Sequence, residues 1–438
     1  MSGSVLDTPE SEGGGARSRG GAPPKLSRSP RMVVPSPQTP SQTGPQFSFV
    51  NLGDSARVAL MIEPRGRGAF EEQAQEVLAQ MREILQKQPQ PMVLILATVF
   101  LREAGDQPAC EKILAEFHGG KPSVMNFVLQ PPCSGAALAI EAWAIGGKSV
   151  WVERHGPDGL SVSYDGVRWI YCAGIQPEAA GDSKVYPAVT SALERTKGAL
   201  HRAGSRFEHV VRLWFYLGDV TGPEGELQRY HELNRARTDF YRDIDFGGSF
   251  LARTDHRGVY PASTGIGMGG RGLIVSCLAL ETNRKDLLLA PLENPRQTPP
   301  YIYPPRYSPQ SPKFARAIAM ILSDYATIWI SGTASVVNSE SRYPGDVEKQ
   351  TEQTIDNIER LIASENFLRH GVKGAGASLQ DLAKIRVYLR HQEDFARCRA
   401  ICERRIGPVP AIYAVADVCR PELLVEIEGV AFSRCAPG

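Results

Sequence analysis

The chain has 438 residues, of which 42% are hydrophobic, and this length is enough for about three domains of ordinary size. The 49 basic and 48 acidic side chains nearly cancel, and no basic stripe with interleaved aromatic residues is present, so a nucleic-acid partner is not expected. No apolar run approaches the roughly 18 residues of a membrane span, and the first residues lack the basic-then-apolar order of a secretory signal.

Residues 1–46 consist largely of Gly, Ser, Pro and Arg with almost no large apolar side chains. Such a segment cannot bury enough surface to offset the entropy lost on ordering, so we expect a disordered tail. From about Phe47 onward, the same series of elements occurs three times. Each unit has a strand pair, an amphipathic helix, a strand ending in a polar turn, a second helix and a closing strand pair.

The first unit spans residues 47–147. Its first helix is predicted over Phe70–Gln86, where apolar residues recur at spacings of three and four. A strand rich in β-branched and aromatic residues follows over 97–106, then a second helix over Gln107–Phe117. A proline-led closing segment over 130–145 ends in an apolar strand.

The second unit, residues 148–285, repeats this order. Its first helix is predicted over Val185–Ala203, with the same apolar spacing as in the first unit. The strand that follows covers 212–220, and the second helix covers Glu226–Phe240. The closing segment over 260–282 contains a glycine-rich turn.

The third unit, residues 286–438, has its first helix predicted over Val347–Ala363, with Asp346 as a candidate N-cap. Its remaining elements are a strand over 384–394, a helix over Phe395–Arg405 and a closing segment over 409–432. The paired strands in each unit predict an α+β fold in which a mixed sheet carries two helices on one face. No G-x-G-x-x-G lies between a strand and a helix, so a dinucleotide site is not expected.

Two segments of the third unit resemble the RidA/YjgF superfamily. SGTASVV at 331–337 resembles that family's strand-end turn, and PAIYAVADVCRPELLVEIEGVAF at 410–432 resembles its C-terminal signature. Within the superfamily the chain is most similar to the chorismatases, as YPASTGIG at 260–267 and SPKFARA at 311–317 indicate. The resemblance implies three tandem RidA-like (chorismate-mutase-like) domains that form one intramolecular pseudo-trimer, with clefts between neighbouring sheets and the chemistry mainly in the third domain.

Imine deaminases of the RidA type hold their substrate's carboxylate with an arginine shortly after the proline of the closing segment. The matching positions here are Cys133, Ser263 and Ile412. Because none is an arginine, simple deamination of 2-iminoacids is not expected in any of the three units.

Glu426 and Glu428 are the candidate catalytic residues. They lie two apart on a predicted strand, so both point to one face of the sheet. Facing solvent they would be ordinary surface carboxylates. Facing a cleft, one of them, with its pKa raised by burial, could protonate an enol ether, and the resemblance implies a catalytic glutamate here.

Further candidates would bind a small carboxylated metabolite. Chorismate carries two carboxylates, so cationic side chains and hydroxyl or backbone donors are needed. The candidates from strands and the C-terminal signature are Arg316, Arg386, Tyr388, Cys419 and Arg420. Those from the two turns are Ser263, Thr264, Ser331, Gly332, Thr333 and Ala334. For Tyr388 and Cys419 a packing role in the core is an equally good interpretation.

Three functional hypotheses remain from the sequence. The first is a chorismatase-like hydrolase that releases pyruvate and either a dihydroxycyclohexadiene carboxylate or a hydroxybenzoate. The second is a RidA-type enamine or imine deaminase, and the third is a non-catalytic metabolite-binding protein. None needs a metal or an organic cofactor. Eight scattered cysteines are typical of a reducing cytoplasm, where we expect the protein to act as a monomeric pseudo-trimer or a higher homo-oligomer.

Overall fold

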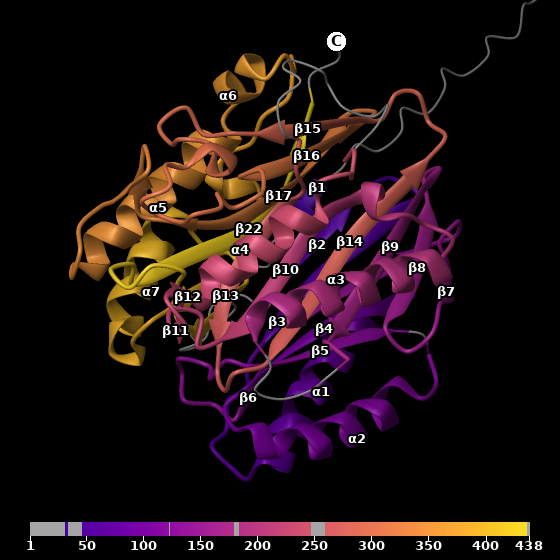
Figure 1. Cartoon of the computed structure of the whole chain (residues 1–438). Coiled ribbons are helices and arrows are strands. Elements are labelled where there is room, and N and C mark those ends of the chain that lie inside the picture. The colour runs from indigo at the N-terminus through magenta and orange to yellow at the C-terminus, as the bar shows by residue number, and fades with distance from the viewer. Residues whose placement is uncertain (1–30, 34–45, 122, 179–183, 247–258, 436–438) are drawn as a thin grey trace, which may run out of the picture.

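A computed structural model describes residues 31–33, 46–121, 123–178, 184–246 and 259–435. Within these residues the chain forms three six-stranded mixed sheets with helices against them (Figure 1). No helix in the described part of the chain is both long and apolar enough to cross a membrane.

The first sheet has the strand order β1-β2-β3-β6-β4-β5. Its strands are β1 (Arg31–Val33), β2 (Phe47–Asn51), β3 (Ser55–Ile62), β4 (Val93–Leu101), β5 (Val124–Leu129) and β6 (Leu138–Gly147). Helices α1 (Phe70–Gln86) and α2 (Gln107–His118) pack against it and bury a shared apolar core. Strand β1 lies within the segment expected to be unstructured, and the rest of that segment, except Gln46, lies outside the described residues.

The second sheet has the order β13-β10-β14-β9-β8-β7. Its strands are β7 (Trp151–Arg154), β8 (Gly159–Tyr164), β9 (Val167–Ile175), β10 (Val210–Gly218), β13 (Ala262–Met268) and β14 (Leu273–Thr282). Helices α3 (Val185–Arg202) and α4 (Arg229–Phe240) cover it. A small hairpin, β11 (Pro223–Glu224) with β12 (Leu227–Gln228), precedes α4.

The third sheet has the order β15-β16-β17-β22-β20-β21. Its strands are β15 (Leu288–Leu292), β16 (Ala317–Leu322), β17 (Tyr325–Ala334), β20 (Leu382–Leu389), β21 (Ala411–Val415) and β22 (Val425–Arg434). Its helices are α5 (Val347–Ile362), α6 (Ser364–Arg369) and α7 (Phe395–Arg405). A second small hairpin consists of β18 (Val336–Val337) and β19 (Glu340–Ser341).

The three sheets share one connectivity. In each, the last long strand lies at the centre and pairs antiparallel with two neighbours, and the edge strand beyond pairs in parallel. Each sheet also has a β-bulge at the same point of this central pairing, just before Leu96, Arg212 and Lys384. A bulge is inherited with a specific local geometry, so its recurrence indicates that the three sheets are structural equivalents.

The helices predicted from apolar spacing are confirmed, with boundaries that differ by at most three residues. Asp346 is confirmed as an N-cap, because its side chain accepts a hydrogen bond from the Lys349 amide at 3.0 Å. Helix α6 was not predicted. It is a six-residue turn whose Phe367 is fully buried in the third core, and it is too short to show helical periodicity.

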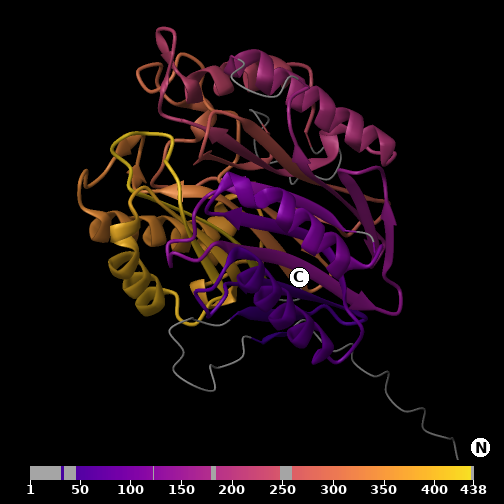
Figure 2. The same ribbon diagram turned by 90° about the horizontal axis from the view of Figure 1, so that it is seen from below.

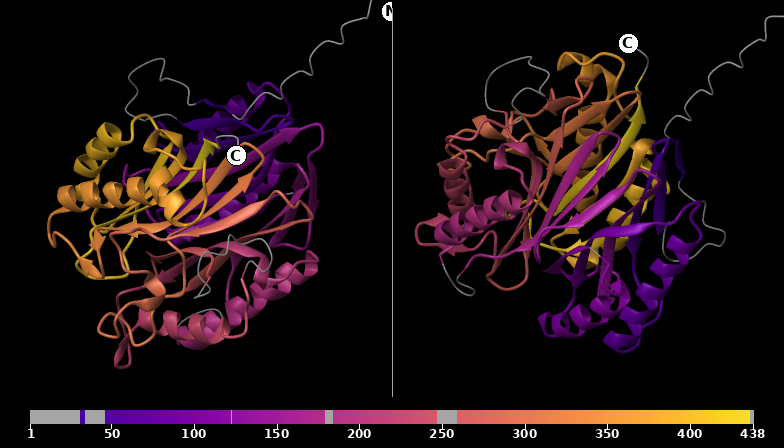
Figure 3. Two further views of the ribbon diagram at one scale, coloured as in Figure 1. Left: turned by 90° about the horizontal axis from the view of Figure 1, so that it is seen from above. Right: turned by 90° about the vertical axis from the view of Figure 1, so that its right-hand side faces the viewer.

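The faces of the sheets that carry no helices meet one another, and the helices lie on the outside (Figures 2 and 3). Trp143, Trp169 and Trp329 come from the first, second and third sheets and share one buried cluster. The rings of Trp169 and Trp329 pack edge to face with centroids 5.6 Å apart. The cluster as a whole joins the three sheets at their centre.

Backbone hydrogen bonds join the edges of neighbouring sheets. The amide of Gly267 in β13 donates to the carbonyl of Asp417 at 2.8 Å, and the amide of Gly269 donates to Leu129 at 2.7 Å. A Cβ atom at position 267 would lie only 2.7 Å from the Asp417 carbonyl oxygen. Glycine is therefore required at this junction for the two backbones to approach.

Candidate functional site

The two candidate glutamates lie on β22 at the junction of the second and third sheets. Glu426 pairs in register with Tyr388, and Glu428 pairs with Arg386. Both carboxyl groups are buried, with 5% of Glu426 and 3% of Glu428 exposed. Their alternation on the strand places them side by side, yet their surroundings differ completely.

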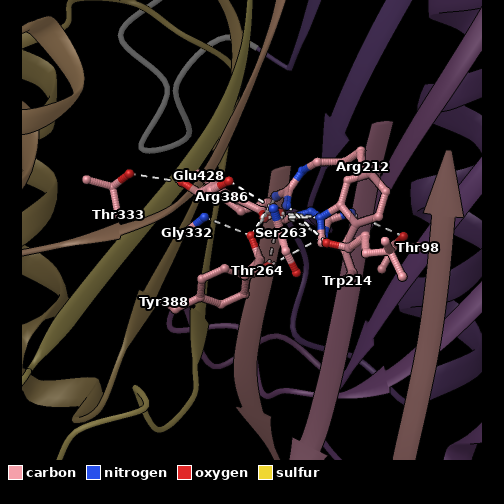
Figure 4. Close-up of polar contacts among 12 residues, drawn as sticks. Thr98, Arg212, Trp214, Ser263, Thr264, Gly332, Thr333, Arg386, Tyr388 and Glu428 are labelled. Carbon is pink, nitrogen blue, oxygen red and sulfur yellow. Dashed lines mark hydrogen bonds and ion pairs between the residues drawn. The ribbon is translucent and has the colours of Figure 1, made fainter. Parts of the chain in front are cut away.

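Glu428 is held as a carboxylate by a dense set of donors (Figure 4). Its partners are Arg212 (2.5 Å), Arg386 (3.0 Å), Trp214 (3.1 Å), Tyr388 (3.2 Å) and the hydroxyl of Thr264. Burial by itself would raise the pKa of Glu428, but the two guanidinium groups outweigh burial and hold that pKa below its usual value. Glu428 is thus an anion whose acceptor positions are occupied.

The same network continues into the first sheet through Arg386. Glu141 on β6 accepts charge-assisted hydrogen bonds from both Arg386 and Lys384, and Arg386 also donates to the hydroxyl of Tyr216 at 2.7 Å. Burial opposes ionisation of Glu141, but Arg386 and Lys384 lower its pKa to about 2. Arg386 was predicted to contact a ligand carboxylate. The structure places it between two protein carboxylates, Glu141 and Glu428.

Glu426 has no hydrogen-bond partner among the described residues. Burial raises the pKa of Glu426 to about 8, the negative charge of Glu428 adds to this effect, and Arg212 opposes it. A Cβ atom at position 332 would overlap the Glu426 carboxyl oxygen, so Gly332 at the end of β17 provides the space that this carboxyl occupies. Near neutral pH Glu426 is therefore a protonated acid whose proton is not bound by any residue that the structure describes.

The surroundings of Glu426 are completed by Tyr230 on α4 and Cys419. Burial, with a contribution from Glu426, raises the pKa of the Cys419 thiol to about 12. Burial also raises the pKa of Tyr230, whose titratable neighbours include Cys419, Arg237 and Glu426. Cys419 is therefore a neutral thiol beside the acid and is unsuited to act as a thiolate nucleophile.

Arg237 on α4 is a buried cation without a carboxylate partner among the described residues. It is 1% exposed, and its one hydrogen bond to a described residue is to the Asn234 side chain at 2.7 Å. Its guanidinium lies 5.6 Å from the ring of Phe215 and 5.8 Å from that of Phe314, and its Nε has no acceptor. A buried, uncompensated guanidinium is costly, so this group is suited to bind an anion that enters the site.

The two predicted turns meet at this junction. The Thr264 hydroxyl accepts a hydrogen bond from the Gly332 amide at 2.9 Å, and the Ser263 amide donates to the Ser331 hydroxyl at 2.9 Å. The Ser263 hydroxyl is buried and has no partner among the described residues. Two further predicted residues face other neighbours. Thr333 donates to the Ser331 carbonyl, and Ala334 packs in an apolar cluster.

Arg316 and Arg420 are both held by protein groups. Arg316 donates to the Tyr303 hydroxyl at 2.7 Å and to the Thr298 carbonyl at 3.0 Å. Arg420 donates to the Ser339 carbonyl at 2.8 Å and stacks on Tyr307, with its guanidinium 4.2 Å from the ring centroid. Both therefore contact the segment that follows β15.

Several residues of the site were missed from the sequence. These are Glu141, Arg212, Trp214, Tyr230, Arg237 and Lys384. Arg212 lies in an apolar strand, and the argument that singled out Arg386, that an arginine inside a strand needs a partner, applies to it equally. No such signal existed for Arg237, because α4 is rich in charged residues and reads as a surface helix.

Comparison with known proteins gives two family matches. A model described as chorismatase FkbO/Hyg5-like, N-terminal, matches residues 141–279, and one described as endoribonuclease L-PSP matches residues 313–433. The two ranges contain Glu141, Arg212, Glu426 and every donor to Glu428 described above.

Several known proteins are similar in sequence to more than half of the chain. A protein of Streptomyces hygroscopicus named 3-hydroxybenzoate synthase is 34% identical over 299 residues, which cover 66% of this chain and 80% of that protein. A protein of Streptomyces rapamycinicus named chorismatase is 33% identical over 287 residues, covering 62% of this chain and 78% of its own. A chorismatase crystal structure matches the fold with a TM-score of 0.60 and 22% identity, over 86% of this chain and 98% of that chain.

Proposed function

This chain belongs to the chorismatase family, and we propose that it is a hydrolase that cleaves the enolpyruvyl ether of chorismate. The observation that carries the proposal is the pair of glutamates on β22. Glu426 is protonated near neutral pH and has no hydrogen-bond partner among the described residues, whereas Glu428 beside it is an ion-paired carboxylate. Two neighbouring carboxyl groups with opposite pKa shifts are the arrangement expected for an acid and an electrostatic stabiliser.

In the proposed reaction Glu426 donates its proton to the methylene carbon of the enolpyruvyl group. This leaves positive charge on the ether carbon, which the carboxylates of Glu426 and Glu428 stabilise through space. Water adds to that carbon and gives a proton back to the Glu426 carboxylate, which forms a hemiketal. The bond from this carbon to the ring oxygen then breaks as Glu426 protonates the ring oxygen and the hemiketal hydroxyl returns a proton to Glu426. The products are pyruvate and a dihydroxycyclohexadiene carboxylate, and the acid is regenerated. If the ring then loses water, the second product is a hydroxybenzoate. No metal or organic cofactor takes part in this scheme.

Substrate binding is assigned first to Arg237, because its guanidinium has no carboxylate partner among the described residues. A carboxylate of chorismate would supply that partner. The Ser263 hydroxyl, which lacks a partner among the described residues, is the second candidate donor. The space at Gly332, which the Glu426 carboxyl occupies, supports the assignment of this acid to the same site.

The proposal extends to the architecture. We assign three RidA-like domains, residues 47–147, 148–285 and 286–438, that assemble as one intramolecular pseudo-trimer. The shared strand order, the matching bulges and the central tryptophan cluster support this assignment. Eight free cysteines fit a reducing cytoplasm, and a monomeric pseudo-trimer is the simplest assembly.

The three junctions of this pseudo-trimer are not chemically equal. In strand register, Glu426 corresponds to Ala139 in β6 and Ile274 in β14. An acid at this position is therefore present at one junction, that between the second and third sheets. We propose that chorismate is cleaved at this junction and not at the other two.

The test is consumption of chorismate with coupled detection of pyruvate. We expect turnover by the natural protein and a loss of about 10³-fold or more in kcat for Glu426→Gln, which removes the acid while keeping the shape. Glu403→Gln on the exposed side of α7 is the control and should keep full activity. If chorismate raises the melting temperature of the natural protein without any pyruvate release, the chain is a metabolite-binding protein and the enzymatic proposal fails.

A further inference from the structure

The buried charges around Glu428 form a chain that reaches into the first sheet. Arg386 lies between two carboxylates and contacts both, Glu141 of β6 and Glu428 of β22. Glu428 in turn lies beside Glu426 and acts on its proton affinity. A side chain of the first sheet is thus connected to the acid through two intervening residues, Arg386 and Glu428.

We propose that Glu141 is a positioning residue for the proton donor, a role that rests on the proposed function. It holds Arg386 and Lys384 in place and cancels part of their charge, and it thereby sets the electrostatic potential in which Glu426 keeps its proton. The first sheet would then contribute to catalysis without contacting the substrate.

The charge balance of the junction supports this role. The buried network contains three cations, Arg212, Lys384 and Arg386, and two carboxylates, Glu141 and Glu428. All five side chains are at most 5% exposed, so solvent screens them weakly. Without Glu141 the network would gain a unit of positive charge, which favours loss of the Glu426 proton.

Five titratable groups in the described part of the chain lie around Glu426. They are Glu428 on β22, Arg212 on β10, Tyr230 on α4, Tyr388 on β20 and Cys419. Burial holds Tyr230, Tyr388 and Cys419 neutral through the working pH range, because it raises the pKa of each. Among these five groups, the ionised neighbours of Glu426 are therefore Glu428 and Arg212. Glu141 is connected to Glu428 through Arg386.

The experiment follows the pH dependence of kcat/KM for chorismate. Activity needs the protonated acid, so it should fall as pH rises through the pKa of Glu426, which burial and Glu428 raise to about 8. A lysine that loses its carboxylate in a buried site can release its own proton, so Glu141 is tested in the background Lys384→Met. There the remaining partner, Arg386, stays charged at every working pH.

We expect Lys384→Met alone to move this basic limb to higher pH, because a positive charge is removed. Adding Glu141→Gln should move it back by about half to one pH unit. Glu281→Gln, which removes an ion-paired carboxylate from the far end of β14, should leave the limb in place. A purely structural role would lower activity at all pH values without moving the limb.

An unshifted limb in a folded Glu141→Gln/Lys384→Met protein overturns the inference. If the double variant does not fold, Lys384→Met alone is the test. An unshifted basic limb in Lys384→Met would show that the charge at position 384 does not affect the pKa of Glu426, and this would also overturn the inference. Both results leave the proposed function standing as long as the natural protein releases pyruvate. Absence of pyruvate from the natural protein is the separate result that rejects the proposed function.

Discussion

At the scale of single residues, Glu426 and Glu428 show how neighbours determine protonation. They share one strand, one face and nearly the same burial, but one meets two guanidinium groups and the other meets a glycine. In the unfolded chain both would ionise with ordinary carboxyl pKa values. Folding therefore raises the pKa of Glu426 and lowers that of Glu428, and each shift makes the stability of the protein depend on pH.

The two corresponding glutamine variants should differ in the sign of their effect on stability. The pKa of Glu426 is raised on folding, so its contribution is most favourable at acid pH and is lost as pH rises from about 4.5 to about 8. Glu426→Gln should thus stabilise the protein at pH 8 by about 2 kcal/mol or more. Glu428→Gln should destabilise it by about 3–5 kcal/mol, because Arg212 and Arg386 lose a buried counter-ion. Urea denaturation at pH 5 and pH 8 measures both, and equal effects would contradict the assignment of protonation states.

Gly332 offers a test of geometry that removes no polar group from the site. In Gly332→Ala the new methyl group overlaps the Glu426 carboxyl, which must turn away from its position. We expect kcat to fall about 10–100-fold with little change in the melting temperature, because the end of a flexible side chain is displaced and not the backbone. Gly105→Ala, whose Cβ would meet open space, is the matched control. Full activity in Gly332→Ala would remove Glu426 from the reaction.

At the scale of elements, α4 carries the assigned anion site. Arg237→Met should weaken chorismate binding, with KM rising about 10–100-fold. The free protein should keep or gain stability, because the change removes a buried cation that has no carboxylate partner among the described residues. Arg235→Met on the same helix removes an exposed, ion-paired arginine and should leave KM unchanged. Steady-state kinetics and thermal unfolding of the two variants separate a ligand contact from a packing role. A normal KM in Arg237→Met would show that substrate carboxylates bind elsewhere.

The elements also show what could be predicted from the sequence and why the rest could not. Helices such as α1 and α5 followed from apolar spacing, because one face of each packs on a sheet. The glutamate pair on β22 followed from strand alternation. The partners of Arg386 did not, since Glu141 lies 245 residues away in the chain and only the packing of two sheets brings them together. The burial of Arg237 could not be predicted either, because the neighbouring residues of α4 are mostly polar or charged and are typical of a surface helix.

At the scale of the whole molecule, three sheets of one connectivity meet through a common apolar centre. The junctions between them are built from corresponding strands, yet their polar residues have diverged. Arg212 faces Glu428 at one junction and Lys384 faces Glu141 at another. The corresponding position in β4 is Leu96, and the residue that corresponds to the two glutamates is Ser276. The residues to which we assign catalysis are thus concentrated where the second and third sheets meet.

The continuity of the chain through all three sheets has a consequence for how such a site can evolve. In a trimer of identical subunits, every mutation appears three times, so a residue that weakens folding weakens it threefold. Here the buried, protonated Glu426 occurs once, and its counterparts are the well-packed Ala139 and Ile274. Gene duplication would allow one junction to accept a destabilising acid while the other two preserve the stability on which it depends.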